Sequence, residues 1–230
     1  MKRRLRTGVV VALAAEARAL TERDIAFEKI VELDSGVHAF VCGMAAGAAT
    51  RAAEALAESG VQRLVSFGMA GALDPALRAG DLLLPSTVID ERGRRFATAP
   101  LASASAPFPS HGEGGLFVLL TTERPLLSPS EKSEARARTG AGAVDMESAM
   151  VAEVALSHAL PFVAMRAVID RADDVVPAAA MMTDTFGRPR SLRLAATLLR
   201  HPGQLPELIR LSGAYARALA TLRGAAAALG

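Results

Sequence analysis

The chain has few aromatic side chains and a single cysteine. Its 230 residues include no Trp, one Tyr and one Cys. Binding modules for single-stranded nucleic acid need several aromatic side chains on one surface, so this composition argues against such a module. Cys42 cannot form a disulfide within the chain, which fits a reducing compartment. We expect it to be a small, buried core residue rather than a nucleophile.

Long apolar runs, an excess of one charge and metal-ligand spacing are also missing. No apolar stretch approaches the roughly 20 residues of a membrane-spanning helix. The 26 Lys and Arg residues nearly balance the 24 Asp and Glu residues, which is atypical of a dedicated nucleic-acid binder. The four histidines are dispersed, and no pair has the spacing of a metal site. We therefore expect no nucleic-acid partner, no metal and no cofactor.

The first residues imitate a secretory signal, because a basic start precedes an apolar run over Gly8–Ala15. The run is at the short limit for that purpose, and a first buried β-strand explains it better. We expect a cytoplasmic protein.

Short apolar runs alternate with Ala-rich helical stretches along the chain. This pattern predicts an α/β protein, a single three-layer domain with a central mixed sheet flanked by helices. The expected strands are Thr7–Leu13, Val37–Cys42, Arg63–Phe67, Asp81–Val88, Leu116–Leu120 and Phe162–Ile169. The expected helices are Glu16–Thr21, Ala45–Ser59, Ser130–Thr139, Ser148–Ala159 and a C-terminal stretch from Ser191. The segment Asp90–Gly115 is predicted to be a long mobile loop.

Glycine-bearing turns are expected after three of the strands: "CGMAAG" (Cys42–Gly47), "FGMAG" (Phe67–Gly71) and "RAGD" (Arg78–Asp81). Glycine permits a positive φ or a close approach of the backbone to a ligand. Neither of the first two is a dinucleotide-binding fingerprint, and no lysine stands where a P-loop needs one. Each turn taken alone is ordinary turn chemistry.

Acidic residues stand in unusual places. Glu16 directly follows the first strand, Asp170 ends the apolar strand "FVAMRAVI", and Glu147 begins a helix. Active sites of α/β sheets gather at the carboxyl edge, where these strands end. Taken singly, Glu147 could only complement the helix dipole and Asp170 only cap a turn. The three together favour a site.

Several motifs carry a family resemblance. "VDMESAMVA" (Val144–Ala152) followed by "RAVIDRADD" (Arg166–Asp174) resembles the purine nucleoside phosphorylase and nucleosidase superfamily, close to the methylthioadenosine and S-adenosylhomocysteine nucleosidases. "FGMAGALDPALRAGDLLLP" (Phe67–Pro85) and "VALAAEAR" resemble two further segments of that family, in the family's order.

The resemblance implies a role for each matching position. Asp170 would protonate purine N7, Glu147 would hold the ribose hydroxyls, Met146 would pack beside the sugar, and Glu16 would orient a hydrolytic water. A positioned acid contributes on the order of 10²–10⁴-fold to such a reaction. Asp170 would need a raised pKa, which an apolar strand end provides through desolvation. Further contacts to substrate are expected from Gly43, Met69, Ala70, Gly71 and Asp145.

Two departures from the family pattern stand out. The nucleosidases usually carry Ser before the catalytic aspartate, where this chain has Ile169. The family's adenine-binding stretch aligns only loosely with "TTERPLLSPSEK" (Thr121–Lys132) in this chain. Thr122 and Leu126 are the candidate residues for contact with the purine.

The resemblance leaves hydrolysis and phosphorolysis open. Phosphorylases of the superfamily hold phosphate with an arginine and a serine, and the corresponding positions here, Met69 and Ser66, do not suit a dianion. Arg18 could instead grip inorganic phosphate as a co-substrate, or be a solvated helix charge. We favour hydrolysis.

The C-terminal part is similar to the hopanoid-associated phosphorylase-like family, thought to remove adenine from adenosylhopane. We treat 186–230 as a basic amphipathic extension of the single domain. It would associate peripherally with the inner face of an anionic membrane, or else cover the sheet or a dimer contact. The resemblance also implies a homodimer. The alternatives are a methylthioadenosine or S-adenosylhomocysteine nucleosidase, a phosphate-dependent phosphorylase, and a non-catalytic protein that binds nucleosides or a lipid surface.

Overall fold

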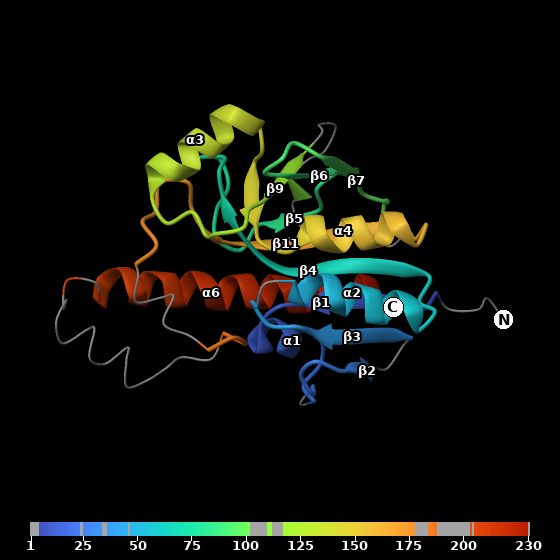
Figure 1. The fold of residues 1–230 in the computed structure, drawn as a ribbon. Coiled ribbons are helices and arrows are strands. Elements are labelled where there is room, and N and C mark those ends of the chain that lie inside the picture. The colour runs from blue at the N-terminus through green and yellow to red at the C-terminus, as the bar shows by residue number, and fades with distance from the viewer. Residues whose placement is uncertain are drawn as a thin grey trace.

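Eleven strands of the described residues form one mixed β-sheet at the centre of the protein (Figure 1). The structure is a computed structural model that describes residues 5–23, 25–33, 36–45, 47–101, 110–111, 117–177, 184–187, 203 and 205–229. The strands are β1 (Thr7–Val11), β2 (Ile30–Glu32), β3 (Val37–Val41), β4 (Arg63–Ala72), β5 (Leu82–Leu83), β6 (Thr87–Asp90), β7 (Arg95–Ala97), β8 (Ser110–His111), β9 (Val118–Thr121), β10 (Ala143–Asp145) and β11 (Phe162–Asp170). The helices are α1 (Ala14–Leu20), α2 (Ala48–Glu58), α3 (Pro129–Thr139), α4 (Ser148–Ser157), α6 (Leu205–Ala226) and the short 3₁₀ helix η3 (Ala227–Leu229).

Strand β4 is the branch point of the sheet. The main path runs β2-β3-β1-β4-β10-β9-β6-β7, while β11 pairs with β4 and β5, and β5 pairs with β8. Strands β1, β3, β4 and β11 run parallel to their neighbours in this group, and β10 pairs with β4 antiparallel. Because parallel strands have a common carboxyl edge, the residues after β1 and β11 meet near the end of β4.

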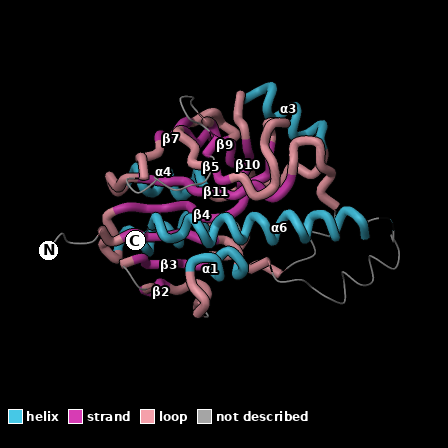
Figure 2. Tube along the Cα trace, turned by 180° about the vertical axis from the view of Figure 1, so that it is seen from behind, coloured by secondary structure: helices cyan, strands magenta, loops and turns pink. Residues whose placement is uncertain are grey.

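Helices cover both faces of the sheet, as the two opposite views show (Figures 1 and 2). On one face α2 and α4 pack together, and their Ala, Leu and Val side chains join the core of the sheet. On the other face α1 and α6 pack against each other, with Ala17, Ala218 and Leu222 in a second core. A smaller cluster joins α3 to β9 and β10. The predicted mixed sheet flanked by helices is confirmed.

Two sequence predictions about the sheet are wrong. The "FGMAG" segment is not a turn, because β4 continues to Ala72 and carries Gly68 and Gly71 within the strand. The expected strand Asp81–Val88 is divided into β5 and β6, which pair with different neighbours. In both places tertiary pairing overrides the local signal, since β11 pairs with β4 up to Gly71.

The segment predicted as one mobile loop, Asp90–Gly115, contains β7, which pairs antiparallel with β6, and β8, which pairs with β5. Residues 102–109 and 112–116 lie outside the described residues. Other local predictions are confirmed. Gly43 and Gly47 have positive φ after β3, Gly80 has positive φ in the "RAGD" turn, and α2 is followed by Gly60 at φ +80.

Helix α6 carries the described part of the C-terminal extension. Its apolar face is formed by Ala214, Ala218, Leu222 and Ala225, all buried at helical spacing, and the helix packs on β11. Residues 188–202, which include Arg193, Arg200 and the first leucines of the proposed amphipathic surface, lie outside the described residues. None of the helices in the described part of the chain is long and apolar enough to cross a membrane.

Candidate active site

Glu16 is held at the carboxyl edge of β1 by two backbone groups. Residue Leu13 precedes α1, and its N–H donates to Glu16 Oε2 at 3.0 Å, while the N–H of Met69 donates to Oε1 at 2.8 Å. The side chain is buried, with the residue 4% exposed. Burial raises the pKa of Glu16, and the nearby Arg166 guanidinium opposes that rise. The carboxyl group is therefore held in one position at this edge of the sheet.

Gly68 makes room for this carboxyl group within β4. A Cβ atom at this position would lie 2.6 Å from Glu16 Oε1 and 3.0 Å from Arg166 Nη1. Such a contact is too short, so a side chain at position 68 would force the Glu16 carboxyl group to move.

Arg166, on β11, is the cation at the centre of the site. Its Nε and Nη2 each lie 2.7 Å from Asp145 Oδ2 at the end of β10. Nη2 also donates to Ser66 Oγ at 2.6 Å and to Ser148 Oγ at 3.0 Å. Burial disfavours the charge, but Asp145, Glu147 and Glu16 outweigh burial and raise the pKa of Arg166. The guanidinium therefore stays charged.

Asp145 is in turn fixed by its other oxygen. Thr121 Oγ1, at the end of β9, donates to Asp145 Oδ1 at 2.7 Å and accepts from the N–H of Ala149 at 3.0 Å. The ends of β9 and β10, the first turn of α4 and the middle of β11 are thus joined by one buried polar network. Such a network is rigid when every member has a partner.

Glu147 stands just before α4 and acts as its N-cap residue rather than lying in its first turn. Its Oε2 lies 3.9 Å from Arg166 Nη2, and its side chain is 20% exposed. Burial raises the pKa of Glu147 to about 8; Asp145 and Glu16 add to this effect, whereas Arg166 opposes it. Met146 beside it is half-buried. Glu147 is thus a carboxyl group that exchanges its proton near neutral pH and keeps some access to solvent.

Asp170 ends β11 at an irregularity of the strand. The register with β4 shifts between Val168 and Asp170, so Asp170 pairs with Gly71. A bulge of this kind redirects a side chain. A Cβ on Gly71 would lie 3.2 Å from Asp170 Oδ1, so the missing side chain leaves space for the carboxyl group. Burial raises the pKa of Asp170, and the Lys132 ammonium, which pairs with Oδ2, opposes the rise.

Two glycines of β4 make room for acidic side chains. Gly68 lies against Glu16 and Gly71 against Asp170. The missing side chain at each position lets a carboxyl group approach the strand backbone.

Other predicted site residues have structural partners. Ser66 is buried and bonded to Arg166. The N–H of Thr122 donates to the Asp145 carbonyl at 2.9 Å, and its hydroxyl donates to the Arg124 carbonyl at 2.8 Å. Leu126 packs against the α3 cluster, and Ala70 is buried in β4. The structure therefore places Ser66 in the Arg166 network, while the two purine nominees, Thr122 and Leu126, lie after β9.

Residues around Gly43 bring the chain after β3 to the same edge. The N–H of Gly43 donates to the Ala12 carbonyl at 3.1 Å, and a Cβ on Gly43 would meet Thr185 Cγ2 at 2.9 Å. Cys42 is buried, as predicted. Burial, Glu147 and Glu16 raise its pKa to about 12, so the thiol stays protonated and is a poor nucleophile.

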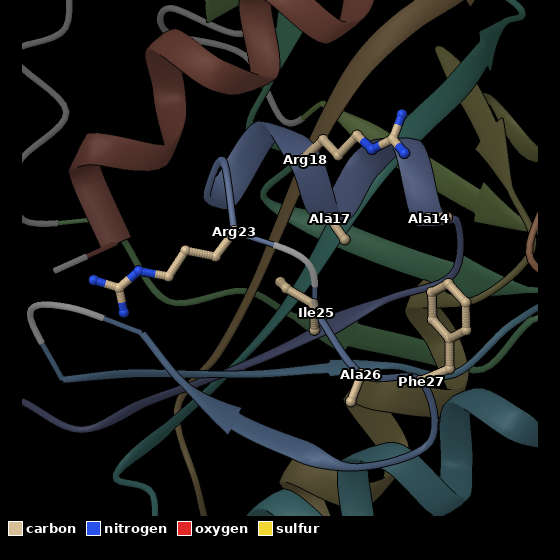
Figure 3. Close-up of a pocket in the computed structure, with 7 residues that line it drawn as sticks. All are labelled: Ala14, Ala17, Arg18, Arg23, Ile25, Ala26 and Phe27. Atoms are coloured by element: carbon tan, nitrogen blue, oxygen red, sulfur yellow. The ribbon is translucent and has the colours of Figure 1, made fainter.

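Arg18 does not lie with the acids. It is exposed and lines a cleft of about 340 Å³ together with Ala14, Ala17, Arg23, Ile25, Ala26 and Phe27 (Figure 3). At 100° per residue, Ala14, Ala17 and Arg18 share one face of α1, and Glu16 projects from the opposite face. Figure 3 shows the guanidinium groups of Arg18 and Arg23 pointing away from each other.

Sequence reasoning missed two charged residues, Arg166 and Lys132. Both are almost completely buried, at 2% and 1% exposure. Arg166 was visible as the one charge in an apolar strand, and a buried charge must be paired. Lys132 gave no such signal, because it stands in a highly charged helix. In the described part of the chain, no group of three or more His, Cys, Asp or Glu residues is placed to hold a metal ion.

Comparisons with known proteins agree with this architecture. The family model of the phosphorylase superfamily matches residues 7–114 and 117–201. Similar structures include 5′-methylthioadenosine/S-adenosylhomocysteine nucleosidase from Neisseria meningitidis, which is 20% identical with a TM-score of 0.66 over 96% of this chain and 98% of that one. The Helicobacter pylori enzyme of the same name is 19% identical, with a TM-score of 0.62 over 75% and 88%.

The futalosine hydrolase of Helicobacter pylori is 21% identical, with a TM-score of 0.60 over 86% of this chain and 96% of that one. No curated protein matches the sequence significantly. At these identities the structural likeness shows the fold, and the chemistry must be argued from the site itself.

Proposed function

Because the chain belongs to the phosphorylase superfamily, we propose that it cleaves the N-glycosidic bond of an adenine nucleoside by hydrolysis. The main support for this proposal is the position of Asp170, a buried carboxyl group with a raised pKa at the carboxyl end of β11. A general acid needs a raised pKa, and burial shifts the pKa of Asp170 in that direction, although the Lys132 ammonium opposes the shift. The nucleosidases and the futalosine hydrolase among the similar structures support this class of reaction.

The reaction needs an acid for the base and a carboxylate for water. Asp170 gives its proton to N7 while the bond between C1′ and N9 breaks and the bonding pair leaves with the base. Glu16 orients a water molecule and takes its proton as the oxygen adds to C1′. Glu147 accepts hydrogen bonds from the ribose hydroxyls, and Met146 packs beside the sugar. Gly71 and Gly68 leave the space that the carboxyl groups need.

Electrostatics favour water over phosphate as the attacking group. The Arg166 guanidinium is already engaged by Asp145, and the acids Glu147 and Glu16 stand beside it. A phosphate dianion placed there would meet several carboxyl groups and one neutralised cation. Arg18, the alternative phosphate ligand, lies on the face of α1 opposite Glu16 and lines a separate cleft. These arrangements support a reaction that does not need phosphate.

We propose adenosylhopane as the substrate, on the resemblance of the "AVDMES" and C-terminal segments to the hopanoid-associated family. The extension would then bring the protein to an anionic membrane surface from the cytoplasm, as a homodimer. The buried face of α6 favours a covering role for its own residues, although Ile209 near its start is 65% exposed. The second candidate is a methylthioadenosine or S-adenosylhomocysteine nucleosidase, supported by the similar structures that bear that name.

Incubation with each nucleoside, with and without phosphate, and measurement of free adenine tests the proposal. We expect phosphate-independent release and a sugar with a free anomeric hydroxyl. Asp170→Asn keeps the shape of the side chain but has no proton to give, so kcat should fall by on the order of 10²–10⁴-fold with a smaller change in KM. Glu16→Gln should be nearly inactive.

An absolute requirement for phosphate would refute hydrolysis, and normal turnover by Asp170→Asn would refute the role of Asp170. Preference for adenosylhopane over the two soluble nucleosides, together with salt-sensitive binding to anionic vesicles, would support the lipid substrate. The reverse preference would favour the second candidate.

A further inference from the structure

Lys132 is a lysine in a place where lysines are rarely found. Its side chain is 1% exposed and lies on the inner face of α3 with Ala135. Lysine usually keeps its ammonium group in water and buries only its methylene stem. A buried ammonium group costs several kcal/mol unless it is fully paired, so this one needs a reason.

The ammonium group is paired completely. It forms an ion pair with Asp170 Oδ2, and it donates to the carbonyl of Arg171 at 2.7 Å and to that of Asp174 at 3.2 Å. An ammonium group has three N–H donors, and here each has an acceptor. The three acceptors therefore hold the group in one orientation.

Local sequence explains how Lys132 reaches this position. Ser128 and Glu131 form a capping box, in which the Glu131 N–H donates to Ser128 Oγ at 3.3 Å and the Ser128 N–H donates to Glu131 Oε2 at 3.0 Å. Pro129 stands at the first position of the helix. The helix start is thus fixed, and Lys132 follows one residue after the box on the buried face.

The turn that follows β11 is fixed on its other side by α6. Asp174 forms an ion pair with Arg210, and the Arg171 N–H donates to Asp174 Oδ2 at 2.9 Å. The two carbonyl groups that accept from Lys132 belong to this same turn. Lys132 therefore contacts a turn that the ion pair with α6 also holds in place.

Within the described residues, Lys132 is the only side chain that donates a hydrogen bond to Asp170. The neighbouring residue Ile169 has no donor to offer. When Asp170 gives its proton to the leaving base, a full negative charge forms on a buried carboxyl group. A cation already in place stabilises that charge without reorganisation.

We propose that Lys132 is a positioning residue of the reaction: its ammonium group holds Asp170 Oδ2, leaves Oδ1 for the base, and stabilises the carboxylate that forms on proton transfer. This inference rests on the proposed function. Asp170 touches the substrate, whereas Lys132 acts through Asp170. The arrangement supplies from α3 the orientation that Ile169 cannot give.

The replacement Lys132→Met tests the inference, because it removes the charge and keeps much of the volume. We expect kcat to fall by on the order of 10²-fold while KM changes little. The ammonium group opposes the rise in the pKa of Asp170, so its loss should move the alkaline limb of the pH profile to higher pH. A purely structural lysine would not move this limb.

A matched control lies one turn further along α3. Arg136 pairs with Asp74 at 3.0 Å on the surface, so Arg136→Met removes a cation from the same helix without touching Asp170. We expect its kcat and pH profile to equal those of the wild type. Lys132→Met with an unchanged kcat, or with an unmoved alkaline limb, overturns the inference.

A double-mutant cycle separates a role through Asp170 from damage to the fold. In the Asp170→Asn background Lys132→Met should have almost no further effect on the residual rate, because the residue it acts through is gone. This double variant also leaves no buried charge without a partner, so it should fold even if Lys132→Met alone does not. An equal loss in both backgrounds would show that Lys132 does not act through Asp170.

A measurement without substrate tests the pairing of Lys132 with Asp170 separately from the proposed function. The carboxyl ¹³C signal of Asp170, identified by its loss in Asp170→Asn, gives the pKa directly. If the wild type releases adenine from no nucleoside, the proposed function fails. The pairing of Lys132 with Asp170 is then supported by a higher Asp170 pKa in Lys132→Met and overturned by an unchanged one.

Discussion

Replacing Arg166 by Met should destabilise the protein more than any change to a surface charge. The guanidinium is 2% exposed and contacts Asp145, Ser66 and Ser148 at 2.6–3.0 Å. Met fills a similar length of space but leaves Asp145 buried without its cation. Breaking a buried ion pair in this way costs about 3–5 kcal/mol. For a chain of this size each kcal/mol lowers Tm by about 2–4 °C, so Tm should fall by about 6–20 °C.

The loss of stability in Arg166→Met should depend on pH in a defined direction. Arg166 lowers the pKa of both Glu147 and Glu16, whose folded-state pKa values are already raised by burial. Without it these values rise further above those of the unfolded chain. The folded variant then binds more protons than its unfolded chain over a wider range of pH than the wild type does. Its free energy of unfolding therefore falls more steeply than that of the wild type as pH rises above about 4.5. The difference in Tm between the variant and the wild type should therefore become smaller toward acid pH.

Thermal unfolding followed by circular dichroism from pH 5 to pH 9 measures both effects. Arg94→Met is the control, because Arg94 pairs with Asp90 and Glu153 on the surface with 47% of its side chain exposed. Exposed pairs contribute about 0–1 kcal/mol. If Arg166→Met unfolds at the same temperature as Arg94→Met, the buried network does not stabilise the fold. If the Tm difference between Arg166→Met and the wild type grows toward acid pH, the loss of stability does not come from buried carboxylates that have lost their cation.

Three further changes have expected outcomes. Gly68→Ala places a Cβ 2.6 Å from Glu16 Oε1, so base release should fall sharply in a steady-state assay, and wild-type kcat would contradict the close approach. Gly213→Ala in α6 meets only Arg217 Nη1 at 3.7 Å, so it should raise stability by about 0.5–1 kcal/mol in urea unfolding, and destabilisation would count against the described helix. The pKa of Glu147 is raised to about 8, so stability should fall as pH rises from about 4.5 to 8. Glu147→Gln removes this carboxyl group and should make the slope of Tm against pH shallower. An unchanged slope would refute the raised pKa of Glu147.

Much of the fold follows from local patterns in the sequence. Apolar runs of strand length and Ala-rich stretches at helical spacing predicted all but the shortest elements, because burial on one face leaves a periodic pattern. Glu16 after the first strand and Asp170 at the end of the last one were visible for the same reason, since a carboxyl group beside an apolar strand is out of place. Capping signals such as Ser128 with Glu131 are equally local.

The tertiary structure alone decided which residues share the site. Asp145 and Arg166 are 21 residues apart, Ser66 and Arg166 are 100 apart, and Lys132 and Asp170 are 38 apart. Their contacts depend on the order of strands around β4 and on the register shift before Asp170, which no local pattern specifies. A buried charge is stabilised by whichever partner the fold brings to it. The sequence therefore marks the acids, and strand pairing chooses the cations that set their pKa values.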